Sequence, residues 1–467
     1  MTRSQLPAGV LPGPDRARAA AGIAARVDRI PAGRFHARLA SLVGVGTFFD
    51  GFDAISLAVL LPVVVKGFGI SLAQAGLIIS AGYLGQFAGA IAVGLLSDRI
   101  GRRRAFLLSL SIISVLAVFC AFAWSAQSLL VFRLLQGIGL GAEVPIAGTI
   151  INEFLGRANR GRIGVVYQSL FSWGLFFAPL IALLLTSSLG PGTGWRVLLG
   201  LGALPLIVVV IGFFALPESP RWLAQQGRLA EADAVVARME AGKDLPAPAA
   251  APVAEDRAFS PGEVLRGRYG RRTLLLIVLW FLAFFVTYGY SSWLPTIYVS
   301  VGKLSATYSL TLTVVLGAIQ VLMCYVVAWC VEHLGRKRSL AYGFGLAVAG
   351  GLFGFLNIVV LDNTTWPYLF ATGIVIGVGI IFPATSLYVY TGELYPTRMR
   401  GFATSLTSSF ARLASIVSPL VFGFLLGAPG GAGLVFAVLG GAALIGTLTT
   451  AFAGIETRAK SLEELSA

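Results

Sequence analysis

The chain has 467 residues, of which 57% are apolar and only 12% charged, and its net charge is +14. A soluble domain carries about a quarter charged residues, so this composition excludes a water-soluble globular protein. The apolar residues recur in runs long enough to cross about 30 Å of hydrocarbon, which predicts an all-α polytopic membrane protein.

The apolar runs predict twelve transmembrane helices in two groups of six. We expect them at residues 40–65, 74–96, 104–123, 127–150, 163–187 and 194–216, and then at 273–300, 309–332, 339–361, 367–391, 401–427 and 430–454. The long loop between the two groups opens with Pro217–Leu223 and continues as an amphipathic helix to about Gly242. The Pro/Ala-rich segment 246–252 is then predicted to be a linker.

This pattern predicts five parts. They are an N-terminal cytoplasmic tail (1–39), an N-terminal six-helix bundle (40–216), a cytoplasmic linker with the amphipathic helix (217–272), a C-terminal six-helix bundle (273–454) and a C-terminal cytoplasmic tail (455–467). Of the 35 Lys and Arg residues, 30 lie in the tails and in alternate loops. This asymmetry follows the positive-inside rule and predicts both termini in the cytoplasm. The positive charge therefore reflects membrane topology, and we expect no nucleic-acid partner.

Two charged motifs occur once in each half of the chain. Asp98, in the Gly/Arg-rich loop between the second and third spans, has a counterpart in Glu332, 234 residues later. Glu153, after the fourth span, has a counterpart in Glu393, 240 residues later. Two motifs at nearly the same offset predict a duplicated six-span unit. Such duplications are typical of secondary transporters, whose substrate site lies between the repeats.

These motifs resemble signatures of the major facilitator superfamily, and the resemblance runs through residues 40–455. Gly94–Arg104 is similar to the family's loop signature between spans two and three, and Arg133 with Gln136–Gly139 is similar to its span-four signature. The resemblance implies the major facilitator fold, with twelve transmembrane helices in two six-helix halves and both termini cytoplasmic. It also implies a central cavity lined by spans one, four, seven and ten, transport by alternating access, and a monomer.

Within the superfamily the chain looks most like proton-coupled metabolite symporters. That branch includes bacterial nicotinate (niacin) transporters and is more distantly related to organic-ion transporters and synaptic vesicle glycoprotein 2. The segments that carry the resemblance are Asp50–Asp53, Gly141–Pro145, Pro217–Leu223, Tyr288–Pro295 and Tyr388–Pro396. Asp50–Asp53 also resembles the aromatic-acid:proton symporters of benzoate and protocatechuate catabolism. Pro217–Leu223 is similar to sugar porters as well, but the seventh span here is aromatic where theirs is Gln-rich, which disfavours a sugar.

Five ionisable side chains lie well inside the predicted spans, where a charge costs at least about 2.5–3.5 kcal/mol unless it faces a cavity or a partner. They are Asp50, Asp53, Arg133, Glu143 and Arg412. At 1.5 Å per residue, Asp53 and Arg133 lie roughly 20 and 25 Å above the cytoplasmic ends of their spans, depths that permit a pair. The same count places Asp50 and Glu143 lower, at roughly 15 and 10 Å.

The acidic residues of spans one and four are candidates for proton coupling. Asp50 and Asp53 share a helix face by their i,i+3 spacing. Two carboxylates held close together away from water cannot both ionise at low cost, so one of them can carry a proton and release it to the cytoplasm. The hypothesis is that Asp50, Asp53 and Glu143 contain the proton-coupling site. The alternative is that one or two of them only neutralise Arg133 and fix the helix packing.

Arg412, in the eleventh span, is the candidate charge for substrate binding. Every acid of the second half lies at a span end or in a loop, so this arginine has no partner at its depth there. A guanidinium stays charged and fits a carboxylate with two parallel hydrogen bonds. We favour a substrate carboxylate as its partner. The alternatives are a permanent salt bridge to the first half and extension of the side chain to the cytoplasmic surface.

Aromatic and polar residues of spans five, seven and ten complete the candidate substrate site. They are Phe171, Trp173, Tyr288, Tyr290 and Tyr388, with Gln168 and Thr385. Clustered rings stack on a flat ligand while hydroxyl and amide groups bind its polar edge, so an aromatic carboxylate would satisfy both the rings and Arg412. The alternative is that these aromatics serve helix packing or the membrane interface.

Charged residues at the cytoplasmic span ends are predicted to act as gates that hold the helix ends together in the outward-facing state. They are Asp98 with Arg102 and its neighbouring arginines, Glu332, and the pairs Glu153–Arg160 and Glu393–Arg400. The alternative is that these charges only set the membrane topology.

The sequence contains no Gly-x4-Gly-Lys-Ser/Thr loop and no metal-binding cluster, so we expect no enzyme activity, no metal and no cofactor. The leading interpretation is a transporter of the bacterial inner membrane that imports a small aromatic carboxylate with protons, nicotinate first. A benzoate or hydroxybenzoate symporter is the alternative within this class. The alternative from another class is a non-transporting receptor on a transporter fold, which the acids of the first span disfavour. The direction of transport stays open.

Overall fold

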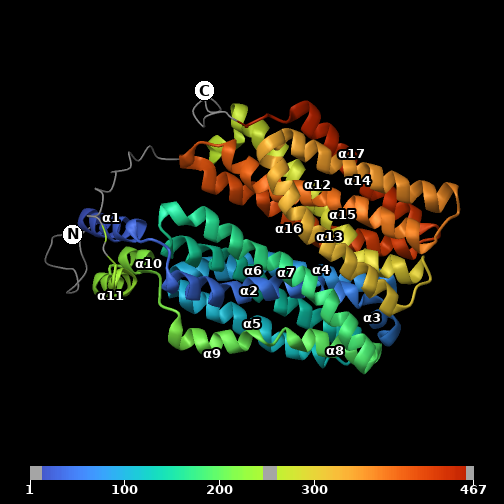
Figure 1. Ribbon diagram of the computed structural model, residues 1–467, viewed down its shortest axis with the longest axis horizontal. Coiled ribbons are helices and arrows are strands. Elements are labelled where there is room, and N and C mark those ends of the chain that lie inside the picture. The colour runs from blue at the N-terminus through green and yellow to red at the C-terminus, as the bar shows by residue number, and fades with distance from the viewer. Residues whose placement is uncertain (1–12, 244, 246–259, 459–467) are drawn as a thin grey trace.

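The computed structural model describes residues 13–243, 245 and 260–458. Within these residues the secondary structure is helical, and the two halves of the sequence form two bundles that lie side by side (Figure 1). The first bundle is coloured blue to green and the second yellow to red. The predicted Pro/Ala-rich linker at 246–252 lies outside the described residues.

The described residues contain twelve helical segments that are long and apolar enough to cross a membrane. In the first half these are α2 (Arg34–Val59), α4 (Leu72–Ile100), α5 (Arg102–Ala121), α6 (Ala126–Phe154), α7 (Arg157–Leu189) and the pair α8 (Pro191–Leu201) and α9 (Pro205–Ala215). In the second half they are α12 (Gly267–Ser300), α13 (Ala306–Leu334), α14 (Arg336–Phe355) with its π-helical extension η3 (Leu356–Val360), α15 (Trp366–Glu393), α16 (Thr397–Gly427) and α17 (Gly431–Ala453). Each segment overlaps one predicted span, so the predicted all-α membrane protein with twelve spans is confirmed.

Two spans of the first half are interrupted at a proline. The helix α2 ends at Val59, and the short helix α3 (Leu61–Phe68) continues it with Pro62 in its first turn. The helices α8 and α9 are separated in the same way, because α9 begins at Pro205. Proline has no backbone N–H and is well suited to the first turn of a helix, so Pro62 and Pro205 lie where a new helix begins.

The helices α4 and α6 pack backbone against backbone because glycines line their contact. A Cβ atom on Gly141 would lie 1.9 Å from the carbonyl oxygen of Gln86, and one on Gly85 would lie 2.0 Å from that of Leu134. Small residues allow membrane helices to approach this closely. The pair therefore forms a tight unit, which fixes Gln86 relative to Arg133 on the neighbouring helix.

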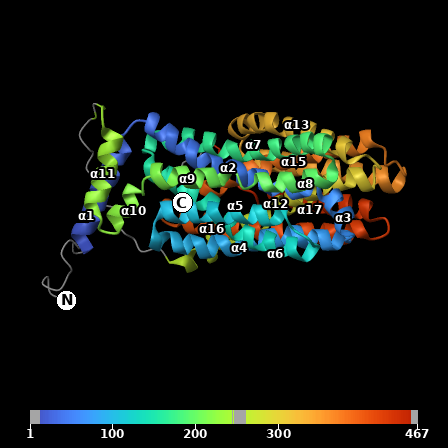
Figure 2. The ribbon, with the colours of Figure 1, turned by 90° about the horizontal axis from the view of Figure 1, so that it is seen from below.

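Three further helices gather at one end of the bundle and lie across it (Figure 2): α1 (Gly13–Arg29), α10 (Pro220–Gln225) and α11 (Leu229–Glu240). We call this end the α11 end, and we call the opposite end, where α3 and α8 lie, the α8 end (Figure 1). The prediction of one amphipathic helix up to Gly242 is wrong in one respect. This stretch forms two helices, which separate where Gly227 adopts a left-handed φ of +78°. The segment predicted as an N-terminal tail contains the helix α1.

Salt bridges hold α1 against α11. Arg26 contacts Asp233 at 2.6 Å and Glu240 at 2.7 Å, and Arg29 contacts Glu240 at 2.7 Å. The hydrogen bond from Arg26 holds the pKa of Glu240 below its ordinary value, because a neighbouring cation stabilises the charged carboxylate. Two arginines therefore share one carboxylate at the centre of this contact.

The two halves pack most extensively along two helix pairs, α4 with α16 and α7 with α13, and α12 also contacts α2 and α3. Toward the α8 end, a Cβ atom on Gly76 of α4 would lie 2.7 Å from the carbonyl oxygen of Pro419 on α16. Farther along α4, Gln86 meets Arg412 of α16. The candidate site lies at this second contact, between the halves.

Candidate functional site

A buried ion pair joins the first and fourth spans. Nη1 of Arg133 lies 2.8 and 2.9 Å from the two carboxylate oxygens of Asp53, and the two side chains are only 8% and 5% exposed. Gln136 accepts from the same Nη1 at 2.9 Å and donates to Asp53 at 3.1 Å. The structure thus brings together the two residues whose depths permit a pair, and Gln136 closes them into a network.

The other two acids of this region have no such partner. Glu143, on α6, is fully buried and accepts a hydrogen bond from Thr47 at 3.1 Å, while its second oxygen has no hydrogen-bond partner in the described part of the chain. Asp50, one turn before Asp53 on α2, lies close enough to Glu143 for the two charges to interact. A buried carboxylate needs a paired charge or hydrogen bonds to offset its desolvation. Asp50 and Glu143 therefore form an acidic cluster whose charge is poorly compensated.

Arg412 lies half-buried on α16, facing the first half. Its Nη1 donates to Oε1 of Gln86 at 2.8 Å, and among the described residues no carboxylate forms an ion pair with it. Asp50, Tyr288 and Tyr388 all lie within electrostatic reach of the guanidinium. The structure therefore gathers around Arg412 one acid of the candidate coupling site and two aromatic residues of the candidate substrate site.

Two residues of α4 connect the Arg133 network with the surroundings of Arg412. Gln86 accepts from Arg412, and Tyr83, one turn earlier, packs edge to face against Tyr288 with ring centres 4.8 Å apart. Both residues also line a cavity of about 10 Å³ beside Arg133, whose Nε has no hydrogen-bond partner within the described residues. The cavity is about the size that one water molecule needs. Neither residue is among the site residues predicted from the sequence, although two polar groups one turn apart in a glycine-rich span are a usable signal.

The structure does not bring every predicted aromatic residue to this site. The hydroxyl of Tyr290 donates to the carbonyl oxygen of Gly373 at 2.7 Å, and the side chain is 3% exposed in the core of the second half. Tyr290 is therefore a packing residue here, since its ring faces α15 and its hydroxyl is already bonded. The i,i+2 spacing from Tyr288 places the two rings on different faces of α12.

The predicted site residues of α7 and α15 differ in their packing and exposure. Trp173 packs against Phe176 and Phe177, and Phe171 approaches α2 so closely that a Cβ atom on Gly51 would lie 2.1 Å from its carbonyl oxygen. Tyr388 is 58% exposed and packs edge to face against Trp280, while Thr385 is half-buried. The side chain of Gln168 lies outside the described part of the chain.

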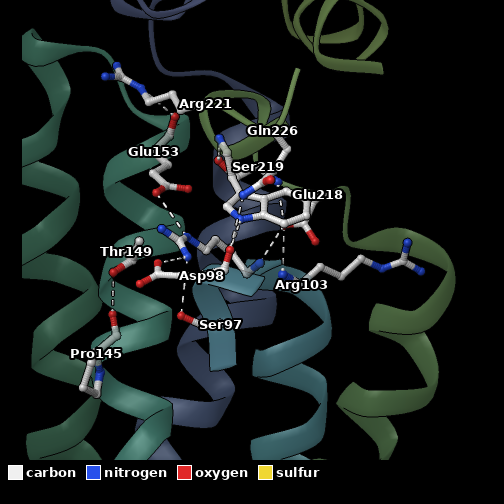
Figure 3. A network of polar contacts seen from close by, with 12 residues as sticks. Ser97, Asp98, Arg103, Pro145, Thr149, Glu153, Glu218, Ser219, Arg221 and Gln226 are labelled. Carbon is white, nitrogen blue, oxygen red and sulfur yellow. Dashed lines mark hydrogen bonds and ion pairs between the residues drawn. The ribbon is translucent and has the colours of Figure 1, made fainter. Parts of the chain in front are cut away.

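A polar network at the α11 end holds the third span of the first half to its neighbours (Figure 3). Arg102, the first residue of α5, contacts Asp98 at 2.5 Å and Glu153 at 3.3 Å. Glu218 accepts the backbone N–H groups of Arg102 and Arg103 at 2.9 and 3.1 Å. A carboxylate at a helix N-terminus satisfies backbone donors that otherwise have no partner.

The second half repeats this arrangement. Arg336, the first residue of α14, contacts Glu393 at 2.7 Å, and Glu456 accepts its backbone N–H at 3.0 Å. Gly101 and Gly335 precede the two arginines with left-handed φ values of +100° and +94°. The structure therefore adds a third repeated pair, Glu218 and Glu456, to the two found in the sequence.

One of the two predicted gate pairings, Glu393–Arg400, differs from the observed one. Glu393 pairs with Arg336 and not with Arg400, and Glu153 pairs with Arg102. The side chain of Arg160 lies outside the described part of the chain. The physical reason is that the first turn of the third span in each half reaches the end of the fourth span. In the second half this places Arg336 of α14 beside Glu393 at the end of α15, whereas Arg400, seven residues after Glu393, forms no ion pair with it. Glu332 is exposed at the end of α13.

Comparisons with known proteins agree with this architecture. The model of the family described as "Sugar (and other) transporter" matches residues 41–467. The niacin transporter NiaP of Acinetobacter baylyi is 32% identical over 446 residues, which are 95% of this chain and 99% of that protein. The gallate transporter of Pseudomonas putida is 30% identical over 422 residues, 89% of this chain and 91% of that protein.

Among solved structures, the xylose transporter XylE of E. coli in a partially occluded inward open conformation superimposes with a TM-score of 0.73. The superposition covers 92% of this chain and 100% of XylE at 15% identity, so it shows the fold alone.

The twelve spans and the bacterial relatives make the chain a multi-pass protein of the bacterial inner membrane. Within the described residues, no group of three or more His, Cys, Asp and Glu is placed to hold a metal ion. The chain belongs to the Sugar (and other) transporter family of the major facilitator superfamily, and it is a membrane transporter and not an enzyme.

Proposed function

We propose that this transporter imports a small aromatic carboxylate, nicotinate first, together with protons. The observation that carries the proposal is the environment of Arg412. Its hydrogen-bond partner is the neutral amide of Gln86, so no carboxylate of the described residues is in ion-pair contact with it, while Asp50, Tyr288 and Tyr388 lie within electrostatic reach. The likeness to proteins named as niacin and gallate transporters supports the same substrate class.

The chemistry of a guanidinium explains why an anion with a flat ring fits here. Arg412 has five N–H donors, and one Nη1 donor is used by Gln86, so the remainder are available for a carboxylate. A hydrogen bond to a charged group contributes about 1.5–3 kcal/mol. The ring of the substrate would pack against Tyr288, whose own ring contacts those of Tyr83 and Phe284.

Proton coupling is assigned to Asp50 and Glu143 and not to Asp53. Asp53 accepts two hydrogen bonds from Arg133 and one from Gln136, so its negative charge is already compensated. Asp50 instead interacts electrostatically with both Arg412 and Glu143, without a hydrogen bond or ion pair to either. When a substrate carboxylate binds Arg412, it replaces Asp50 as the counter-charge, and Asp50 then takes up a proton. In this scheme the anion and the proton move together.

The same layout suggests how the cytoplasmic gates work. The α11 end is assigned to the cytoplasm because the basic loops concentrate there. The halves pack against each other toward the α8 end through α4 and α16, while Arg102–Glu153 and Arg336–Glu393 each join two helices of a single half. These pairs would release their partners and form contacts between the halves when the cytoplasmic side closes.

The test is uptake of radiolabelled nicotinate into proteoliposomes with an imposed inward proton gradient. We expect accumulation that is abolished by a protonophore, with little uptake of nicotinamide, which has the same ring without the charge. Xylose serves as the control for a sugar substrate. Gradient-independent binding without accumulation would contradict the proposal and would instead favour a receptor on a transporter fold.

A benzoate-type acid is the second candidate, since the likeness to a gallate transporter favours it. Hydroxylated benzoates would use the same guanidinium and would also bind the hydroxyl groups of Thr385 and Tyr388. The same proteoliposomes distinguish the two candidates. Benzoate or gallate uptake without nicotinate uptake would keep the fold and the coupling scheme and would change the substrate.

A further inference from the structure

A basic groove lies outside the candidate transport site, between the turn that joins α4 to α5 and the helix α11. Its volume is about 250 Å³, and its charged lining consists of four arginines and two glutamates: Arg103, Arg104, Arg228, Arg238, Glu218 and Glu231. The groove is therefore formed jointly by the end of the membrane bundle and by a helix that lies across that end.

Both glutamates of the groove already have partners. Glu231 holds Arg228 through two contacts of 2.6 and 2.7 Å. Glu218 accepts backbone N–H groups at the start of α5 and the N–H of Ser219. The other three arginines, Arg103, Arg104 and Arg238, form no ion pair with a carboxylate among the described residues. The groove thus has an uncompensated positive charge.

One arginine of the groove, Arg103, reaches an exposed aromatic residue at the end of a membrane span. Arg103 donates to the carbonyl oxygen of Phe213, near the end of α9, and its guanidinium lies over the ring of the same residue at 5.6 Å. Phe213 and Phe214 are 62% and 83% exposed, and in a membrane protein such rings contact acyl chains or the interface. Figure 3 shows the Arg103 side chain extending away from Asp98 and Glu153, so it does not take part in the Arg102 network.

We propose that this groove binds the phosphate of an anionic phospholipid headgroup, with the acyl chains lying along Phe213 and Phe214. Guanidinium groups bind phosphate oxygens bidentately, and basic pockets at membrane-helix ends are suited to anionic headgroups. A phosphate here would join α5 to α11 by charge. It would thereby hold the cytoplasmic helices against the bundle beside the Arg102 network.

The test uses the purified full chain in detergent, with bound lipid measured by native mass spectrometry. Phosphatidylglycerol and phosphatidylcholine with the same acyl chains are titrated separately. We expect the wild type to prefer phosphatidylglycerol, and we expect Arg104→Gln with Arg238→Gln to lower its affinity by about fivefold for each arginine removed. Equal binding of the two lipids by the wild type would by itself overturn the proposal, whatever the variants show.

The repeat supplies a matched control. Arg338 lies 234 residues after Arg104, at the same position of the duplicated loop, and it is exposed on α14. Arg338→Gln should therefore leave the preference for phosphatidylglycerol unchanged, and an equal loss in this variant would contradict the assignment to the groove. If the double glutamine variant does not fold, Arg104→Lys with Arg238→Lys keeps the charge and loses the bidentate geometry, so we expect a partial loss of affinity. Full retention of affinity in the lysine variant would contradict phosphate recognition by the guanidinium groups.

A soluble phosphate has the same chemistry, and a competition arm distinguishes it from a lipid. Inorganic phosphate and glycerol 3-phosphate are added to the complex with phosphatidylglycerol. We expect neither to displace the lipid at equimolar concentration, because neither has acyl chains to pack on Phe213 and Phe214. Displacement by either compound at that concentration would assign the groove to a soluble phosphate and would refute the lipid proposal.

Discussion

Substitution of Asp53 by asparagine should destabilise the protein strongly, because it leaves Arg133 buried without a counter-charge. Arg133 is 7% exposed, and Asp53 accepts both contacts from its Nη1 and one from Gln136. Removing one partner of a buried ion pair costs about 3–5 kcal/mol. This cost corresponds to about two to four powers of ten in the unfolding equilibrium. Asparagine keeps the shape and one acceptor, so the effect isolates the charge.

The matched control is Asp50→Asn, which makes the same chemical change one turn away. Asp50 has no ion pair within hydrogen-bonding distance among the described residues, so we expect a change in stability of no more than about 1 kcal/mol. Equilibrium unfolding in mixed detergent micelles, followed by circular dichroism, measures both variants. The double variant Asp53→Leu with Arg133→Leu should recover most of the lost stability. Wild-type stability of Asp53→Asn, or equal losses in the two asparagine variants, would refute this assignment of roles.

Three further predictions concern the candidate site and the α1–α11 contact. Gln86→Glu places a carboxylate 2.8 Å from Arg412, so it should compete with the substrate and raise KM for nicotinate by more than about tenfold; an unchanged KM in proteoliposome uptake would count against the carboxylate site. Asp50→Asn should abolish accumulation driven by the proton gradient while leaving nicotinate binding measurable by calorimetry, and retained accumulation would exclude Asp50 as the proton carrier. Because the pKa of Glu240 is lowered in the folded protein, its salt bridges should stabilise the α1–α11 contact above its unfolded pKa of about 4.3 and weaken as the pH falls through the lower folded value. Spin labels on α1 and α11 should then move apart as the pH falls through that lowered folded pKa, whereas Glu240→Gln should show the larger separation already at neutral pH. A distance independent of pH in the wild type would contradict the role of Glu240.

The sequence allowed the spans and the depths of buried charges to be predicted, because both follow from length and rise per residue. Asp53 and Arg133 were placed at similar depth by counting 1.5 Å per residue, and the structure joins them at 2.8 Å. The repeat offset likewise predicted that the loop after the second span and the loop after the eighth would be equivalent. Arg102 and Arg336 occupy equivalent positions in the two halves.

The direction in which a side chain points could not be predicted in the same way. A soluble helix reveals its buried face through its polar face, whereas these spans are apolar all around. Tyr288 and Tyr290 therefore looked equivalent in the sequence, although one lies near Arg412 and the other is bonded to Gly373. Gln86 was missed for a related reason, because its partner lies 326 residues away in the other half. That contact depends on how α4 and α16 cross, which no local pattern encodes.

The central claim is that Arg412 binds the carboxylate of an aromatic substrate. Calorimetric titration of nicotinate and nicotinamide into the wild type and into Arg412→Gln tests it most directly, because the two ligands share a ring and differ in charge. The account predicts that the wild type binds nicotinate more tightly than nicotinamide. In the variant, nicotinate affinity should fall by about one to two powers of ten, to the level of nicotinamide, whose own affinity should not change. Unaltered nicotinate binding in Arg412→Gln, or an equal loss for both ligands, would contradict the claim.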